Sequence, residues 1–286
     1  MPTKMFSCLP FLKYLLLGLL FFFTNLSIPN AIAAPLPELW SRWQSHDPTS
    51  TQVVDKIVWN KLLNKYLVTN HSSGINLFRY GKVSTEDRKK LSEYIGYLQQ
   101  VLVSILNNEE QKAYWINLYN ALTVKTILDH YPVKSILDID ISPGFFSNGP
   151  WGAKLLTIEG EKVSLNDIEH RILRPIFNDN RIHYAVNCAS IGCPNLQQEA
   201  FTTKNMDVLL EKGAYAYINS PRGAQIVKGR LHVSSIYKWF KVDFGGSNES
   251  VVKHLLQYSE GELAEALRNY NKGFNYDYDW SLNKQD

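Results

Sequence analysis

The chain has 286 residues, of which 45% are hydrophobic and 20% charged, with a formal net charge of +3. This composition is typical of a globular protein that buries a sizeable core. The small net charge, without a run of basic residues, excludes the electrostatic pattern of a nucleic-acid-binding protein. We therefore expect no nucleic-acid partner.

The N-terminal segment has the three parts of a secretory signal peptide. Lys4 and Lys13 supply the positive region, residues 14–23 the apolar region, and residues 31–33 a small-x-small cleavage motif. We predict a signal peptide over residues 1–33 and export to the periplasm or the cell exterior. The apolar run is shorter than the roughly 20 residues that a membrane span needs. We expect no stable span after cleavage, with an uncleaved anchor as the alternative.

The rest of the chain predicts one α+β domain. Residues 34–52 form a lead-in segment, and residues 53–286 form a single globular domain. Apolar periodicity, capping residues and turn residues predict the elements of this domain. The predicted helices are residues 53–68, 84–106, 108–130, 164–175 and 204–218. The predicted strands are residues 182–188 and the hairpins 154–163 and 225–233. We expect long N-terminal helices packed with a small, mainly antiparallel sheet.

The densest group of polar residues is the segment 183–194, with the sequence HYAVNCASIGCP. If this segment begins as a strand, His183 and Cys188 lie on opposite faces, and Cys188 ends the strand beside a loop of small residues. A nucleophilic cysteine needs a base, which is usually an imidazole. His183, His170 and His232 are the candidates.

Three interpretations of the cysteines stay open. Cys8 lies in the predicted signal peptide and would leave with it, so Cys188 and Cys193 remain. In an oxidising compartment this close pair can form a structural disulfide. Cys188 can instead be a catalytic thiolate. Zinc ligation is the third interpretation, but no C-x2-C or H-x3-H spacing supports it, and we expect no metal and no cofactor.

The predicted helix 164–175 carries Glu169, His170 and Arg174. On an α-helix Glu169 and His170 are about 100° apart, so we expect them to contact different neighbours. His170 and Arg174 have the i,i+4 spacing of a contact. Glu169 can orient an imidazole, as the third member of a triad does. The alternative is a helix face that forms salt bridges and hydrogen bonds to adjacent loops.

The predicted helix 108–130 carries Trp115, Asn117 and Asn120 among apolar residues. Asparagine is a poor helix-interior residue, so two of them in this setting predict specific hydrogen-bond partners. Asn117 is a candidate donor to an oxyanion or a substrate. The alternative is that these side chains clamp a nearby loop.

These segments together resemble domain-of-unknown-function family 547, over about residues 111–283. The resemblance rests on the segments YWINLYNALTV, GPWGAKLLTIEGEKVSLNDIEHRILRP, IHYAVNCASIGCPNL and YDWSLN, in that order. The matching positions are Trp115, Asn117, Tyr119 and Asn120 on the helix, Glu169, His170 and Arg174 on the EH-x-x-x-R helix, and His183, Cys188, Ser190, Cys193 and Pro194 in the cysteine loop.

The resemblance brings no established activity. It implies that members also occur in plants as domains of larger intracellular proteins, where a disulfide tends to be reduced, and this favours a functional thiol. An α+β build with cysteine, histidine and an acidic or amide residue is similar in kind to papain-like and transglutaminase-like hydrolases. That analogy is at the level of the fold, and it needs a permuted order, because here the cysteine follows the histidine.

The leading hypothesis is a cysteine-dependent hydrolase or acyltransferase that acts on amide bonds of a small-molecule or peptide substrate. The candidate catalytic residues are Cys188, His183, His170, Glu169 and Asn117, and the candidate substrate-binding residues are Trp115, Asn120, Arg174, Ser190 and Cys193. The alternative is a non-catalytic exported binding domain with a structural disulfide between Cys188 and Cys193 and a protein partner.

Overall fold

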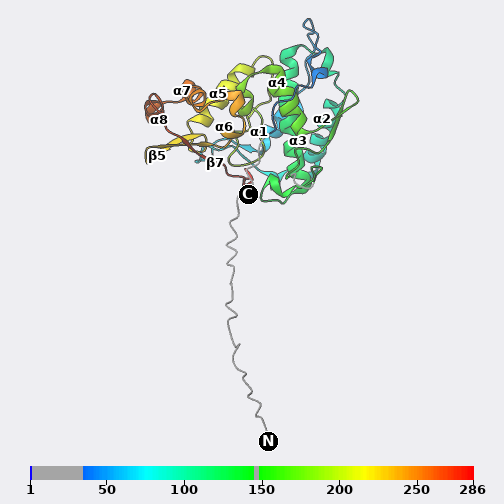
Figure 1. The fold of residues 1–286 in the computed structure, drawn as a ribbon. Coiled ribbons are helices and arrows are strands. Elements are labelled where there is room, and N and C mark those ends of the chain that lie inside the picture. The colour runs from blue at the N-terminus through cyan, green and yellow to red at the C-terminus, as the bar shows by residue number, and fades with distance from the viewer. Residues whose placement is uncertain (2–34, 145–147) are drawn as a thin grey trace. The chain divides into compact units, whose positions relative to one another are not determined.

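The computed structural model describes residue 1 and residues 35–144 and 148–286. The predicted signal peptide therefore lies, apart from Met1, outside the described residues. From residue 35 onward the described chain belongs to one compact unit that combines helices with small sheets, as Figure 1 shows. The fold class is α+β, as predicted. No helix in these ranges is both long enough and apolar enough to cross a membrane.

Three helices build the N-terminal part of this unit. They are α1 (Ile57–Tyr66), α2 (Thr85–Leu98) and α3 (Asn108–His130). Ser84 caps α2 as predicted, and its hydroxyl accepts the backbone N–H of Asp87 at 3.2 Å. The helix ends at Leu98 and not near residue 106. The next helix begins after Asn107, whose side chain accepts the backbone N–H of Glu110 at 2.9 Å. A short 3-10 helix, Val103–Ile105, lies between the two.

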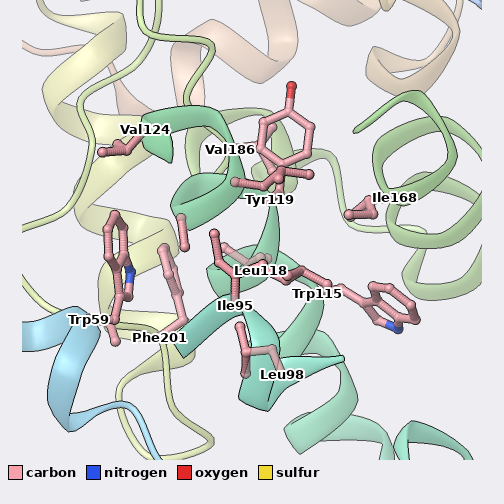
Figure 2. Packing of buried hydrophobic residues seen from close by; sticks show 14 of the residues in the cluster. Trp59, Ile95, Leu98, Trp115, Leu118, Tyr119, Val124, Ile168, Val186 and Phe201 are labelled. Carbon is pink, nitrogen blue, oxygen red and sulfur yellow. The ribbon is translucent and has the colours of Figure 1, made fainter. Parts of the chain in front are cut away.

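Helix α3 is the centre of the larger hydrophobic core. Trp115 is fully buried, and its ring lies 5.0 Å from the rings of Trp43 and Tyr114. Figure 2 shows Trp115, Leu118 and Tyr119 of α3 packed beside Ile95 and Leu98 of α2, and the Tyr119 hydroxyl points away from the packed side chains. A helix that is buried on nearly all sides makes any polar side chain within it dependent on an internal hydrogen-bond partner.

The strands form three small sheets. They are β1 (Leu67–Val68) with β2 (Leu77–Phe78), β3 (Leu156–Ile158) with β4 (Glu161–Val163), and β5 (Ala224–Val227) with β6 (Arg230–Ser234) and β7 (Phe274–Asp277). Both predicted hairpins are confirmed, and their turns at Glu159-Gly160 and Lys228-Gly229 have the positive φ of tight hairpin turns. All strand pairs are antiparallel except β6 with β7, which is parallel.

The predicted strand 182–188 is wrong. The chain there forms a 3-10 helix, Asn180–Tyr184, and continues without regular structure. Its backbone bonds to a side chain instead of a neighbouring strand, because Asn120 Nδ2 donates to the Ala185 carbonyl at 2.9 Å and the Asn187 N–H donates to Asn120 Oδ1 at 2.8 Å. The apolar character of this segment reflects its burial in the core.

The predicted helix 164–175 is a π-helix, Asp167–Leu173, that runs into α4 (Arg174–Phe177). Ser164 and Asp167 bond to each other's backbone N–H at 3.2 and 2.7 Å, which confirms the predicted cap. The helix continues through Pro175, and the carbonyls of His170 and Arg171, about one turn before the proline, accept the backbone N–H groups of Glu38 and Trp40, both at 3.0 Å. The remaining helices are α5 (Met206–Ile218), α6 (Ile236–Trp239), α7 (Asn248–Tyr258) and α8 (Gly261–Leu267).

Candidate functional site

Cys188 is half-buried, and its thiol lies among hydroxyl groups. Its sulfur is 3.0 Å from Tyr278 Oη and 3.3 Å from Ser190 Oγ. The Ser190 hydroxyl donates to Tyr278 Oη at 3.0 Å. This leaves the Tyr278 O–H free to donate to the sulfur, so the two hydroxyls form a relay that ends at the thiol.

This environment favours the thiolate of Cys188. Hydrogen bonds from Cys193, Ser190 and Tyr278 lower the pKa of the Cys188 thiol and outweigh the opposing effect of desolvation. Burial raises the pKa of the Tyr278 phenol well above its ordinary value. Tyr278 therefore stays protonated at neutral pH and acts as a hydrogen-bond donor, not as a base.

Cys193 is the inner partner of Cys188. The backbone N–H of Cys188 donates to the Cys193 sulfur at 3.0 Å. Desolvation raises the pKa of the Cys193 thiol well above its ordinary value. Both cysteines are free thiols in the structure, so the disulfide of the alternative interpretation is not formed there.

The backbone between the two cysteines is held in an uncommon conformation. Ala189, directly after Cys188, has a φ of 60°, in the left-handed region that costs a residue with a Cβ about 1–2 kcal/mol. Asn187 Oδ1 accepts its N–H at 2.9 Å, and its carbonyl accepts the N–H of Asn283 at 3.0 Å. Such strain is typical of functional sites. The sequence does not predict this conformation, because alanine rarely adopts a positive φ.

The C-terminal segment docks on the cysteine loop and brings Tyr278 to it. The N–H of Gly192 donates to the carbonyl of Asp279 and the N–H of Ile191 to the carbonyl of Ser281, both at 2.8 Å. A Cβ at position 192 would lie 2.8 Å from the backbone nitrogen of Asp279. Only glycine therefore permits this close approach.

Two further side chains, which the sequence did not point to, fix the other side of the loop. The Arg222 guanidinium donates to the carbonyls of Ile191 and Cys193 at 2.8 and 2.7 Å. The Tyr217 hydroxyl donates to the carbonyl of Gly192 at 2.6 Å. The loop is thus hydrogen-bonded from both sides, and these bonds hold the backbone that carries Cys188 and Cys193.

Tyr278, whose hydroxyl contacts the thiol, belongs to a cluster of aromatic rings. The Tyr278 ring lies 4.6 Å from that of Trp280 and 4.8 Å from that of Trp239, and Trp280 contacts Trp151 at 5.7 Å. All four rings are partly exposed. This cluster adjoins the thiol through Tyr278.

A second polar cluster forms around His183. Its Nε2 lies 2.7 Å from Asp243 Oδ2, and Arg174 donates to both oxygens of the same carboxylate, at 2.6 and 3.2 Å. Burial raises the pKa of Asp243, but the hydrogen bonds from His183 and Arg174 prevail and lower it to about 2. The carboxylate is therefore charged, and the His183 proton that faces it is on Nε2. The Phe240 ring stacks on the imidazole at 4.1 Å.

Glu169 lies close to both His183 and His170. Its Oε2 accepts the Tyr119 hydroxyl at 3.0 Å, and its Oε1 is 3.9 Å from His183 Nδ1 and 4.0 Å from His170 Nδ1. Within the described residues Oε1 accepts no hydrogen bond, and it is not fully enclosed by neighbouring atoms. Glu169 thus keeps one carboxylate oxygen available.

Glu169 and His170 form hydrogen bonds with different neighbours, Tyr119 and Arg174, as expected. The wider turn of the π-helix also narrows the angle between these successive side chains, and Glu169 Oε1 lies 4.0 Å from His170 Nδ1. The predicted i,i+4 contact of His170 with Arg174 is present, at 3.1 Å. His170 Nδ1 accepts this hydrogen bond, and desolvation lowers the pKa of its imidazole to about 4, so His170 is neutral at neutral pH.

The two clusters adjoin each other but are not joined by a direct thiol–imidazole bond. Burial and the charges of Glu169 and both cysteines raise the pKa of Tyr119, and the Glu169 charge also acts on Cys188. Among the residues that the structure describes, however, no imidazole bonds to the Cys188 sulfur. His183 bonds to Asp243, and His232 lies 3.0 Å from Asn275 Nδ2.

The candidate residues of α3 bond to neighbouring segments or pack in the core. Asn117 bonds to both the carbonyl and the N–H of Phe201, at 2.8 and 2.9 Å. Asn120 binds the segment before Cys188 in the same way. These contacts match the loop-clamping alternative. The complete burial of Trp115 favours a packing role over contact with a substrate. Ser190 and Cys193, in contrast, lie directly at the thiol.

Across residues 35–144 and 148–286, no group of three or more histidine, cysteine or acidic side chains is arranged to hold a metal ion. The zinc interpretation of the cysteines therefore gains no support from the arrangement of these side chains.

Residues 103–218 match the family model described as "Protein of unknown function, DUF547". The chain thus contains a DUF547 domain, which includes α3, both polar clusters except Asp243 and Tyr278, and the cysteine loop. The match ends before the C-terminal YDWSLN segment. Comparison with curated proteins and with solved structures found no match.

Proposed function

We propose that this DUF547 domain is a cysteine-dependent hydrolase or acyltransferase that acts on amide bonds, with Cys188 as the nucleophile. The observation that carries the proposal is the position of the thiol. Cys188 is half-buried beside the partly exposed Tyr278, whose hydroxyl lies 3.0 Å from the sulfur, in an arrangement that favours the thiolate. A thiolate that a substrate can reach is the requirement for covalent catalysis by cysteine.

In the proposed reaction the Cys188 thiolate attacks the carbonyl carbon of the amide. The C–N bond breaks, the amine leaves with a proton taken from the site or from water, and a thioester forms on Cys188. The Tyr278 hydroxyl, which lies 3.0 Å from the sulfur and accepts a hydrogen bond from Ser190, is positioned to donate to the negatively charged carbonyl oxygen of the intermediate.

Water or an acceptor amine then attacks the thioester, and it must lose a proton as it does so. Glu169 Oε1 is the group available for this proton, since it accepts no hydrogen bond from the described residues. His183 can share the proton, because its Nδ1 lies 3.9 Å from the same oxygen and its other nitrogen is fixed by Asp243. Proton transfer through a bridging water fits these distances.

The test is covalent acylation of the reduced full chain in a Cys8→Ser background, which leaves only the two cysteines of the site. After incubation with p-nitrophenyl acetate, intact mass and peptide mapping should find one acetyl group on Cys188, and a panel of acyl anilides should show turnover. Cys188→Ser should lose both, while Cys193→Ser keeps the adduct. Acetylation no faster than that of free cysteine, with no turnover of any anilide, would contradict the proposal.

The second candidate, a non-catalytic binding domain with a protein partner, is favoured by one observation. Asn117, Asn120, Arg174 and His183 all form hydrogen bonds within the fold. If these residues serve only the fold, substitution of His183 should lower the melting temperature by several degrees. Normal acylation of a variant that is destabilised in this way would favour a structural role for His183 itself.

Export through the N-terminal signal remains part of the proposal. It is supported by the order of positive, apolar and small residues over positions 1–33. Intact mass of the protein recovered from the periplasm or medium tests it, and a mass that begins at Ala34 is expected. Recovery of the full-length chain in the cytoplasm alone would refute it.

A further inference from the structure

We infer that Cys188 and Cys193 act as a dithiol pair that exchanges with a disulfide substrate and closes a reversible bridge between the two residues. This activity goes beyond the proposed acyl transfer and does not depend on it. The basis is the position of the Cys193 sulfur, which lies 3.0 Å from the backbone nitrogen of Cys188 and accepts its hydrogen bond. Both thiols are free, and they also interact directly through their side chains.

The two cysteines differ in access, and this difference assigns their roles. Cys188 is half-buried, whereas Cys193 is only 4% exposed. An incoming disulfide can therefore reach Cys188 but not Cys193. The acidities agree with this order, because the pKa of Cys188 is lowered and that of Cys193 is raised. Cys188 is the attacking thiol, and Cys193 is the resolving thiol.

The loop between the cysteines is already closed in the reduced protein. Arg222 bonds to the carbonyls of Ile191 and Cys193, and Tyr217 bonds to the carbonyl of Gly192. Much of the conformational entropy that bridge formation removes has therefore been lost on folding.

The exchange has two steps. The Cys188 thiolate attacks one sulfur of the substrate disulfide, forms a mixed disulfide and releases the first substrate thiolate. Cys193 then gives its proton to that thiolate or to solvent and attacks the Cys188 sulfur, which releases the second substrate thiolate. The substrate disulfide gains two electrons, and the two cysteines lose them as their bond forms.

The bridge should be reversible and should control the proposed acyl transfer. The groups that stabilise the Cys188 thiolate also stabilise the reduced form and make Cys188 a good leaving group, so a thiol can reopen the bridge. While the bridge is closed, Cys188 has no thiolate with which to attack a carbonyl. Oxidation would therefore switch the nucleophile off.

The experiment treats the reduced full chain, in the Cys8→Ser background, with glutathione disulfide at neutral pH and reads intact mass after acid quenching. The otherwise unsubstituted chain should lose two hydrogens and show a peptide linked through Cys188 and Cys193. Cys193→Ser should accumulate one glutathione on Cys188. Cys188→Ser should remain unmodified, and excess dithiothreitol should restore every reduced mass.

Three outcomes would overturn the inference. They are accumulation of the mixed disulfide without bridge closure, a chain that stays reduced in excess glutathione disulfide, and a bridge that dithiothreitol cannot open in the folded protein. Melting curves of both serine variants exclude misfolding as the cause, and Cys188→Ala repeats the test with a residue that cannot hydrogen-bond. Acylation by p-nitrophenyl acetate is measured on the same samples, so failure of the exchange and failure of the proposed function are distinguishable.

Discussion

Tyr278 and Cys188 are separated by 90 residues in the sequence, yet the tyrosine hydroxyl lies 3.0 Å from the cysteine sulfur. The contact exists because the C-terminal segment bonds along the cysteine loop at Gly192 and Ile191. It makes the most C-terminal part of the chain a component of the thiol site, although the DUF547 match ends at residue 218.

Replacement of Tyr278 tests this contact directly. Tyr278→Phe keeps the ring but removes the hydroxyl that stabilises the thiolate, so the pKa of Cys188 should rise. A hydrogen bond to a charged group is worth about 1.5–3 kcal/mol, which corresponds to one pKa unit or more. Alkylation of Cys188 by iodoacetamide at neutral pH should slow about three- to tenfold, since the higher intrinsic nucleophilicity offsets part of the loss.

The control for this variant is Tyr276→Phe, on β7 two residues before Tyr278. The hydroxyl of Tyr276 forms no hydrogen bond to the cysteine loop within the described residues. Its removal should leave the alkylation rate unchanged. An equal rate for Tyr278→Phe and the unsubstituted chain would show that the hydroxyl does not stabilise the thiolate.

The two asparagines of α3 should differ in what they affect. Asn117→Ala leaves the backbone N–H and carbonyl of Phe201 without partners and should lower the free energy of unfolding in urea by about 2–4 kcal/mol. It should not alter alkylation of Cys188. Asn120→Ala should be similarly destabilising and should also change the alkylation rate, because Asn120 holds Ala185 and Asn187 just before the cysteine.

Asn108→Ala is the matched control, because Asn108 is the exposed first residue of the same helix. Its free energy of unfolding should change by less than about 0.5 kcal/mol. If Asn117→Ala and Asn120→Ala give the same alkylation rate as the unsubstituted chain, the segment before Cys188 is held by its other contacts.

Glu169→Gln separates activation of the thiol from proton transfer. The negative charge of Glu169 raises the pKa of Cys188, so its removal should leave alkylation equal or slightly faster. If Glu169 accepts a proton during breakdown of the thioester, the acetyl group should persist on Cys188 at least tenfold longer, within the 10²–10⁴ range of general base catalysis. An unchanged lifetime of the adduct would remove Glu169 from this role.

Stability should fall at acidic pH because of buried histidine. Burial lowers the pKa of His254, which lies 2.7 Å from the Tyr184 hydroxyl, from 6.5 to about 4. The unfolded chain binds this proton at a higher pH than the folded chain. The contribution of His254 is therefore complete above pH 6.5 and is lost as the pH falls toward 4.

His254→Gln should remove this contribution. Between pH 6 and 4.5, roughly, the slope of unfolding free energy against pH should decrease by up to about 1.4 kcal/mol per pH unit. Urea titrations at matched pH measure it. His170 has a pKa of about 4 for the same reason, so the unsubstituted chain should take up nearly two protons from these residues on unfolding. An identical slope in the variant would mean that His254 is accessible to protons in the folded state.

The sequence by itself determined the elements whose signals are local. Capping residues and helical periodicity gave α3 and the start of α2, and turn residues gave both hairpins, because these interactions lie within a few residues of each other. The motifs of the cysteine loop, Glu169 and His183 likewise identified the region in which the polar clusters form.

Only the tertiary structure decided which of these residues meet. Segment 182–188 has the composition of a strand but bonds to the side chain of Asn120, and the π-helix turns Glu169 toward both histidines. Tyr278, Arg222 and Asp243 reach the clusters from other elements across long sequence separations. Their roles are set by packing and by buried hydrogen bonds between segments that are distant in the sequence. The pattern of neighbouring residues does not predict such contacts.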